Sequence, residues 1–189
     1  HGERVKGASW WWAAGLGEGA GGAATLESHQ RERGMARPDA PDEPVPTEAD
    51  QRLIDAIRAG DEGRVEAALR NGASVDTSIE DGLTALMVAI LIGGRTRIAK
   101  LLLARGADVH RQHPTGARAV HAAAQVGDAE LVAALAEAGA NVKTPNNDGA
   151  TPAYIAAEYG QAEVVRLLAE LGAKVETPMN DGTTSAYIA

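Results

Sequence analysis

The chain of 189 residues contains no cysteine and no phenylalanine, and aromatic residues make up only 3% of it. Without cysteine, disulfide bonds, thiolate metal sites and a cysteine nucleophile are excluded. Without phenylalanine, a hydrophobic core has to be built from Leu, Val, Ile and Ala. Such a core suits thin structural units that each contact only their neighbours.

Long hydrophobic runs are also missing. The longest, from Ala85 to Ile92, is far shorter than the ~18 residues that a transmembrane helix needs, so we predict no membrane insertion. The charge balance is acidic, with 18 basic against 26 acidic residues and a formal net charge of −8. An acidic chain argues against general nucleic-acid binding, which depends on neutralising phosphates.

A basic cluster between residues 95 and 118 is the local exception. Its members, with only Asp108 of opposite sign among them, are Arg95, Arg97, Lys100, Arg105, Arg111 and Arg118. Two interpretations stay open. The cluster is either a docking site for an acidic peptide or a phosphate, or a solvated outer helix face, which is the more common role of a charged run.

The chain does have an internal repeat. The stretch that begins at Asn147-Asp148-Gly149 returns 33 residues later at Asn180-Asp181-Gly182. A period of this size marks a solenoid of stacked units. Recurring Gly, Gly-Ala and Val residues extend the period backwards, and they give the units 48–80, 81–114, 115–147, 148–180 and a partial unit 181–189. The second unit has one extra residue, which belongs to the pair Gly93-Gly94.

Each unit carries two short segments of helical period. In the fourth unit these are 151–159 and 162–171, and the second segment places its Val and Leu residues on one stripe. Helices this short are marginal in isolation, so each unit needs its neighbours. Asn and Asp-Gly between the units favour tight, hairpin-like turns. We therefore predict an all-α stack of helix–turn–helix units joined by such turns.

This pattern resembles the ankyrin repeat. The fourth unit carries it most fully, at Thr151-Pro152, Ala156-Ala157, Val164-Val165 and Gly172-Ala173. The resemblance covers residues 48–189 and implies an ankyrin-repeat solenoid.

The same resemblance gives roles to particular residues. It implies that His121 bonds turn backbone and ties adjacent units together, and that Tyr154 and Tyr187 take this place in the later units. Arg118-Ala119 replaces the family's Thr-Pro, so the third unit lacks the proline that presets a helix start.

The two ends of the chain depart from the repeat. Because the chain begins with His1 and stops at Ala189, inside the first helix of a unit, we expect further repeats beyond it. Residues 1–47 have no period and are predicted to be a disordered N-terminal segment. For residues 1–34 two interpretations stay open: a disordered leader, or translated non-coding sequence upstream of an initiator at Met35.

No reactive constellation accompanies the repeats. The glycine pattern in 17–22 matches a dinucleotide-binding motif by chance, because no strand precedes it and no helix follows. His110 and His113 have no further metal ligands nearby and are interpreted as turn residues. Asp81 and Asp148 each stand beside glycine, as is typical of turns. We predict no catalysis, no cofactor and no metal.

The ankyrin resemblance implies that a partner binds at the turn tips and on the face of the first helices. The predicted partner-binding residues are Glu80, Asp81, Leu83, Thr115, Ala117, Asn147, Asp148 and Ala150 in the turns, and Leu91, Ile92, Gln125, Val126, Glu158 and Tyr159 near the first-helix ends. Four of the latter are apolar where water is expected, and an exposed apolar patch often marks an interface. The other interpretation is that they pack under neighbouring loops.

Two hypotheses about function follow. The first is a non-catalytic scaffold that binds another protein. The alternative is the repeat arm of a larger signalling enzyme or channel whose working domain lies outside this chain. In both cases we expect an intracellular, cytoplasmic and monomeric chain that has a protein partner and does not bind nucleic acid.

Overall fold

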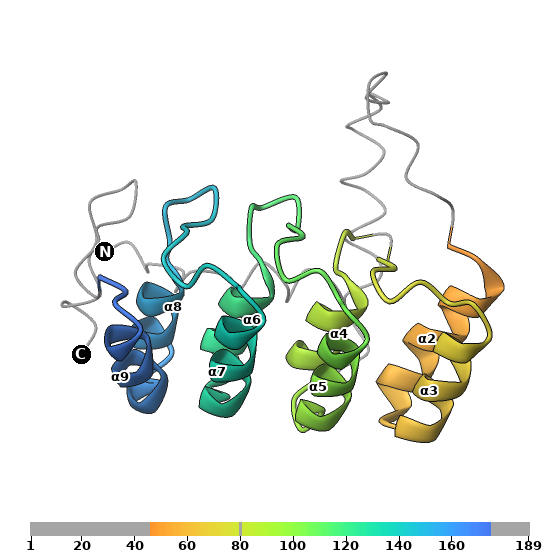
Figure 1. Ribbon diagram of the computed structural model, residues 1–189. Helices are drawn as coiled ribbons and strands as arrows, with labels where there is room; N and C mark the ends of the chain where they lie inside the picture. Colours follow the sequence, from red (N-terminus) through yellow and green to blue (C-terminus); the bar gives the residue numbers. More distant parts are fainter. Residues whose placement is uncertain (1–45, 80, 175–189) are drawn as a thin grey trace, which may run out of the picture. The chain divides into compact units, whose positions relative to one another are not determined.

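The computed structural model describes residues 46–79 and 81–174, which belong to one compact unit that starts at Pro46. Its helices are α2 (Glu48–Ala59), α3 (Glu62–Arg70), α4 (Ala85–Leu91), α5 (Thr96–Ala104), α6 (Ala119–Val126), α7 (Ala129–Glu137), α8 (Pro152–Glu158) and α9 (Ala162–Glu170) (Figure 1). The predicted segment 1–47, except for Pro46 and Thr47, and the predicted partial unit 181–189 lie outside the described residues.

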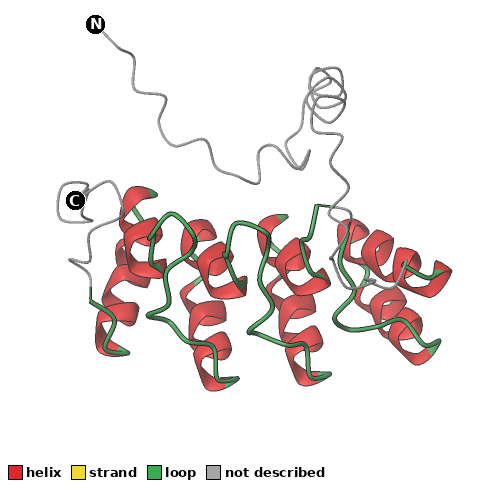
Figure 2. Cartoon of the chain, turned by 90° about the horizontal axis from the view of Figure 1, so that it is seen from above, coloured by secondary structure: helices red, strands yellow, loops and turns green. Residues whose placement is uncertain are grey.

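The helices pair within each unit and stack from one unit to the next. The first helices α2, α4, α6 and α8 contact one another in that order, and the second helices α3, α5, α7 and α9 do the same (Figure 2). The described residues contain no strand, only an isolated antiparallel bridge between Ser78 and Thr84. The predicted all-α solenoid is therefore confirmed.

Each helix buries one face between its neighbours. The largest side chains that are almost fully buried come from every unit and include Leu53, Leu86, Leu102, Leu131 and Leu168. Burial of such a side chain contributes about 2 kcal/mol. The first helices also bury alanines, among them Ala89, Ala123 and Ala156 at 0% exposure, and these small side chains let the helix backbones approach closely. The core is built without a single phenylalanine for this reason.

The starts of the first helices depend on local hydrogen bonds. Thr84 and Thr151 cap α4 and α8, each accepting a backbone N–H at 3.2 Å. Pro152 occupies the first turn of α8, where its missing N–H has no cost. In α6, which has neither residue, the backbone N–H of Arg118 donates to Nδ1 of His121 at 3.1 Å. The histidine ring thus anchors the start of α6, which among the described first helices is the one without a threonine at its N-cap.

Asp50 fixes the first unit to its own loop. Its carboxylate accepts from the Thr47 backbone at 2.8 Å and from the Ser74 backbone N–H at 2.7 Å, although its side chain is buried. Burial alone would raise the pKa of Asp50, but the hydrogen bonds from Thr47 and Ser74 outweigh it and lower the pKa below the usual value. The ionised form therefore holds α2 against the segment that follows α3.

Candidate partner-binding surface

The C-terminal ends of α6 and α8 expose apolar side chains at equivalent positions of adjacent units. Val126 is 38% exposed and Tyr159 is 39% exposed. Each immediately precedes the glycine that follows the first helix, Gly127 or Gly160, and both glycines have positive φ. Because α6 and α8 pack side by side, the two side chains belong to one surface. We call Gln125, Val126, Glu158 and Tyr159 the first-helix ends.

The polar members of the first-helix ends flank these two side chains. Gln125 is half-buried, and Glu158 is exposed. The surrounding protein nevertheless removes part of the water around Glu158 and raises the pKa of its carboxyl. In the second unit the matching residues Leu91 and Ile92 are half-buried. The exposed apolar surface therefore lies on the third and fourth units.

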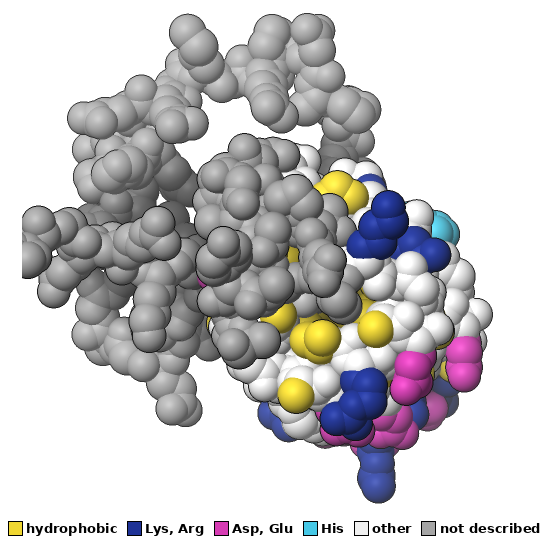
Figure 3. All heavy atoms as spheres, turned by 90° about the vertical axis from the view of Figure 1, so that its left-hand side faces the viewer, with side chains coloured by type: hydrophobic (Ala, Val, Ile, Leu, Met, Phe, Trp, Pro, Cys, Tyr) yellow, Lys and Arg dark blue, Asp and Glu magenta, His cyan; other side chains and the backbone are white. Residues whose placement is uncertain are grey.

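Large exposed apolar side chains are scarce elsewhere on the described residues. Leu171, 38% exposed, follows α9 on the second-helix side. It lies at the α8–α9 end of the stack, whose surface shows apolar side chains among charged ones (Figure 3). Leu171 is therefore not part of the first-helix ends.

The turn tips are linked from unit to unit. Asn147 donates from its backbone N–H to the Thr115 carbonyl at 2.9 Å and from its side chain to the Pro114 carbonyl at 3.0 Å. Asp81, Asn147 and Asp148 are exposed, and Thr115 is half-buried. These predicted residues thus lie at the surface of neighbouring turns, and Glu80 lies outside the described residues.

Three predicted turn residues do not lie at the surface. Leu83 and Ala117 are 0% exposed and Ala150 is 5% exposed, so the expectation that they present side chains to a partner is wrong. Their carbonyls accept backbone hydrogen bonds from Ile79, His113 and Asn146 at 3.0, 2.8 and 2.9 Å. Each bond closes a hairpin-like turn, after which the side chain points back onto the helix. An apolar or small residue recurs at this position in successive units, and this recurrence is the sequence signal that the side chain is buried.

The two turn histidines have local roles. Nδ1 of His113 lies 2.9 Å from the Thr115 hydroxyl, within the turn. Burial lowers the pKa of His113, partly opposed by the backbone and charge of Asp81. His110 is exposed. Within the described residues no group of three or more His, Cys, Asp or Glu side chains is placed to hold a metal ion.

His121 is fully buried between the third and fourth units. Burial first, and then the charge of Arg118, lower its pKa to about 4, against smaller opposing contributions from the backbone of Thr144, Ala150 and Arg118. The ring is therefore neutral at pH 7. Because Nδ1 accepts the Arg118 N–H, the ring proton sits on Nε2. Tyr154 is buried at the equivalent place in α8, and Tyr187 lies outside the described residues.

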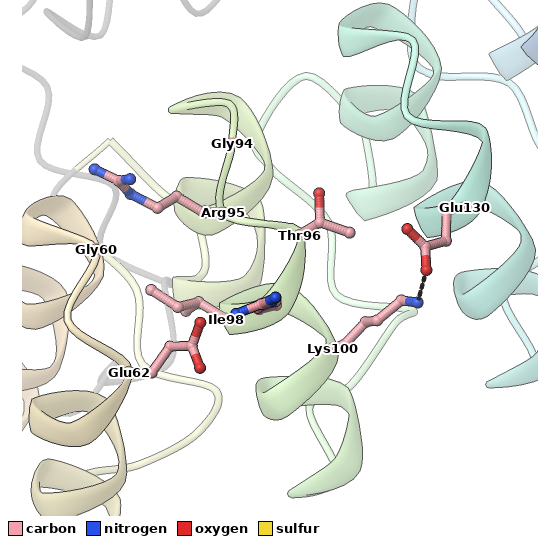
Figure 4. A pocket seen from close by; sticks show the side chains of 9 residues that line it. Gly60, Glu62, Gly94, Arg95, Thr96, Ile98, Lys100 and Glu130 are labelled. Carbon is pink, nitrogen blue, oxygen red and sulfur yellow. Dashed lines mark hydrogen bonds and ion pairs between the residues drawn. The ribbon is translucent and has the colours of Figure 1, made fainter.

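The basic cluster does not form one surface. Arg95, Arg97 and Lys100 line a hollow of about 620 Å³ at the start of α5, together with Glu62 and Glu130 (Figure 4). Lys100 pairs with Glu130, and Arg95 points at Gly60 and donates to the Arg58 carbonyl at 3.3 Å.

Two further cations of the cluster are engaged elsewhere. Arg105 pairs with Glu66 at 3.2 Å, and Arg118 donates to the Gly116 carbonyl at 3.4 Å. These contacts favour the solvated helix face over an acidic dock. The carboxylates that line the hollow come from other units, so the sequence between residues 95 and 118 gave no sign of them.

Two further findings bear on what the chain is. No helix of the described residues is long and apolar enough to span a bilayer. A comparison with curated proteins found no match to this chain.

A comparison with family models matched residues 86–179 to the model described as ankyrin repeats (3 copies). The match starts within α4 and covers most of the second unit, the whole third unit and nearly all of the fourth. Ankyrin repeats are in general protein–protein interaction modules, and they are typically non-catalytic. With its paired helices, glycine-centred turns and buried His121, the chain belongs to the ankyrin-repeat family.

Proposed function

We propose that this chain is a protein-binding module whose partner contacts the first-helix ends and the exposed turn tips of the third and fourth units. The observation that carries the proposal is the pair Val126 and Tyr159, which expose apolar side chains at equivalent positions on adjacent helices. Exposed apolar side chains in register are costly to leave in water, and a protein partner would cover them. Tyr is also favoured where interfaces concentrate their binding energy.

The tips add a polar margin to this surface. Asp148 and Asn147 are exposed, and the hydrogen bonds of Asn147 to Pro114 and Thr115 hold two neighbouring tips together. A surface that is ordered before binding loses little conformational entropy on association. The proposal assigns binding to the remaining exposed members of the predicted set and drops Leu83, Ala117 and Ala150.

Site-specific photo-crosslinking in cells tests the proposal. A photoreactive amino acid is placed at Tyr159 or Val126 of the full chain, and in a control at Glu137, an exposed residue in the last turn of α7. We expect discrete protein adducts from positions 159 and 126 and not from 137. Equal adducts from all three positions, or none from 159 and 126, would overturn the proposal.

Four finer predictions stay predictions. The repeats are the arm of a larger signalling enzyme or channel in the alternative hypothesis, and the same surface would then bind a partner of that assembly. The intracellular location and the monomeric state are likewise expectations, which fractionation and sedimentation of the natural protein would test. The repeat domain is proposed to run from residue 48 to residue 189.

A further inference from the structure

We infer that the protein segment bound at the first-helix ends carries a lysine or arginine next to an apolar side chain. Glu158, whose carboxylate is unpaired among the described residues, directly precedes Tyr159 of the exposed apolar pair Val126 and Tyr159. This inference rests on the proposed function and names the chemistry of its partner.

Val126 and Tyr159 supply the apolar part of the surface that the partner segment would contact. Each is more than a third exposed, and each occupies the last position before the glycine that follows its helix. An apolar side chain of a partner segment would contact these positions on adjacent helices. Covering the pair removes apolar surface from water, which favours association by roughly 25 cal/mol per Å².

The charged half comes from Glu158. Three other glutamates of the helices form ion pairs: Glu48 with Arg52, Glu66 with Arg105, and Glu130 with Lys100. Glu158 has no ion pair or hydrogen bond to another described residue. It is also already part-desolvated, as its raised pKa shows. A partner that covers Tyr159 takes further water away from this carboxylate.

The free-energy cost of desolvating the Glu158 carboxylate favours a partner segment that carries a positive charge. A wholly apolar or acidic segment leaves the Glu158 charge buried and uncompensated, which is strongly unfavourable. A lysine or arginine beside the apolar side chain supplies the missing counter-charge at the margin of the interface. The net charge of −8 adds to this preference, because it attracts basic segments during encounter.

Selection from a phage-displayed library of random peptides on the full chain tests the inference. The selected peptides are synthesised, and their Kd is measured for the wild type, Tyr159→Ala, Glu158→Gln and Glu158→Lys. We expect peptides with Lys or Arg next to an apolar residue, weakened at least about tenfold by Glu158→Lys and less by Glu158→Gln. Replacing the basic residue of the peptide by Glu restores binding to Glu158→Lys.

Glu137→Lys is the matched control, since it makes the same change of net charge at an exposed carboxylate of α7. We expect it to change Kd less than twofold. Glu158→Gln keeps the test decisive if the lysine variant folds poorly in circular dichroism.

Two contrary outcomes are distinct. Peptides that lose affinity for Tyr159→Ala, carry no Lys or Arg and bind Glu158→Lys normally would overturn this inference and leave the proposed function standing. Selected peptides that bind Tyr159→Ala as well as the wild type, or a selection that yields no binding peptide, would overturn both.

Discussion

The side-chain amide of Gln161 lies against Gly127 of the preceding unit and donates to the Gln125 carbonyl at 3.1 Å. A Cβ at residue 127 would stand 2.2 Å from Oε1 of Gln161, closer than any real contact. Arg95 repeats the arrangement over Gly60, where a Cβ would stand 2.4 Å from its Cζ. The glycine that closes a first helix thus makes room for a side chain at the start of a later second helix.

Gly127→Ala is expected to lower the free energy of unfolding by about 2–3 kcal/mol. The positive φ of 82° costs a residue with a Cβ about 1–2 kcal/mol, and displacing Gln161 loses a hydrogen bond of about 1 kcal/mol. Gly139→Ala is the control, because residue 139 has φ 92° but nothing within 4 Å of its Cβ. Urea denaturation measures both. Equal losses in the two variants would show that the Gln161 contact contributes nothing.

His121 predicts a specific acid sensitivity. Burial and the charge of Arg118 hold its pKa at about 4 in the folded protein, against an ordinary value of 6.5. Between these values the unfolded chain binds a proton that the folded chain does not. The free energy of unfolding therefore falls as pH drops from 6.5 towards 4, by about 3 kcal/mol in total, and is unaffected above pH 6.5.

Denaturant midpoints at pH 7 and pH 4.5, measured for the wild type and His121→Gln, check this prediction. The variant lacks the titrating ring and is expected to be less stable at pH 7, but to lose less on acidification. Parallel pH profiles for the two proteins would contradict the assignment of the acid sensitivity to His121.

Tyr154 lies in α8, and Tyr159 is the C-cap of the same helix. Their substitution compares the stability contributions of a buried and an exposed tyrosine. Tyr154 is 7% exposed and Tyr159 is 39% exposed. We expect Tyr154→Ala to cost about 3 kcal/mol, because it leaves a cavity in the core beside Ala150 and Ile155, and Tyr159→Ala to shift the melting temperature by no more than a degree or two. Thermal melts followed by circular dichroism compare them. A large loss for Tyr159→Ala would place this residue in the core and remove it from the binding surface.

Asp128 caps α7 and also bonds to Thr96 at the start of α5, so it joins two second helices. Oδ1 accepts the Leu131 N–H at 2.9 Å, and Oδ2 accepts the Thr96 hydroxyl at 2.5 Å. Asp128→Ala is expected to cost about 2 kcal/mol, of which about 1 kcal/mol is the cap. Asp61→Ala removes a comparable cap on α3, in which Asp61 Oδ1 accepts the Arg64 N–H, and should cost only about 1 kcal/mol.

A double-mutant cycle of Asp128→Ala and Thr96→Val isolates the hydrogen bond between the Thr96 hydroxyl and the Asp128 carboxylate, which joins two units. A coupling energy of about 1 kcal/mol is expected between Asp128 and Thr96. Additive losses in the cycle would mean that Asp128 acts on α7 alone.

The repeat, the helix pairs and most of the residues that start and end the helices could be predicted from the amino-acid sequence alone. A 33-residue period, Thr84 and Thr151 at helix starts, and glycines at helix ends act through contacts a few residues apart, so they can be read from neighbours in the chain. The exposure of Val126 and Tyr159 is one of two alternatives that the sequence left open, and Leu91 and Ile92 at the matching positions are half-buried.

Which residues face another unit depends on how the folded units stack. Leu83, Ala117 and Ala150 belong to turns whose other members are exposed, yet they are buried where the turn folds back on its helix. Gln161 has its role because the Gln125 carbonyl of the preceding unit lies against it, and His121 has its low pKa because it is buried between two units. Burial and pKa depend on what packs on a residue from about a whole repeat away, and no local pattern in the chain contains that information.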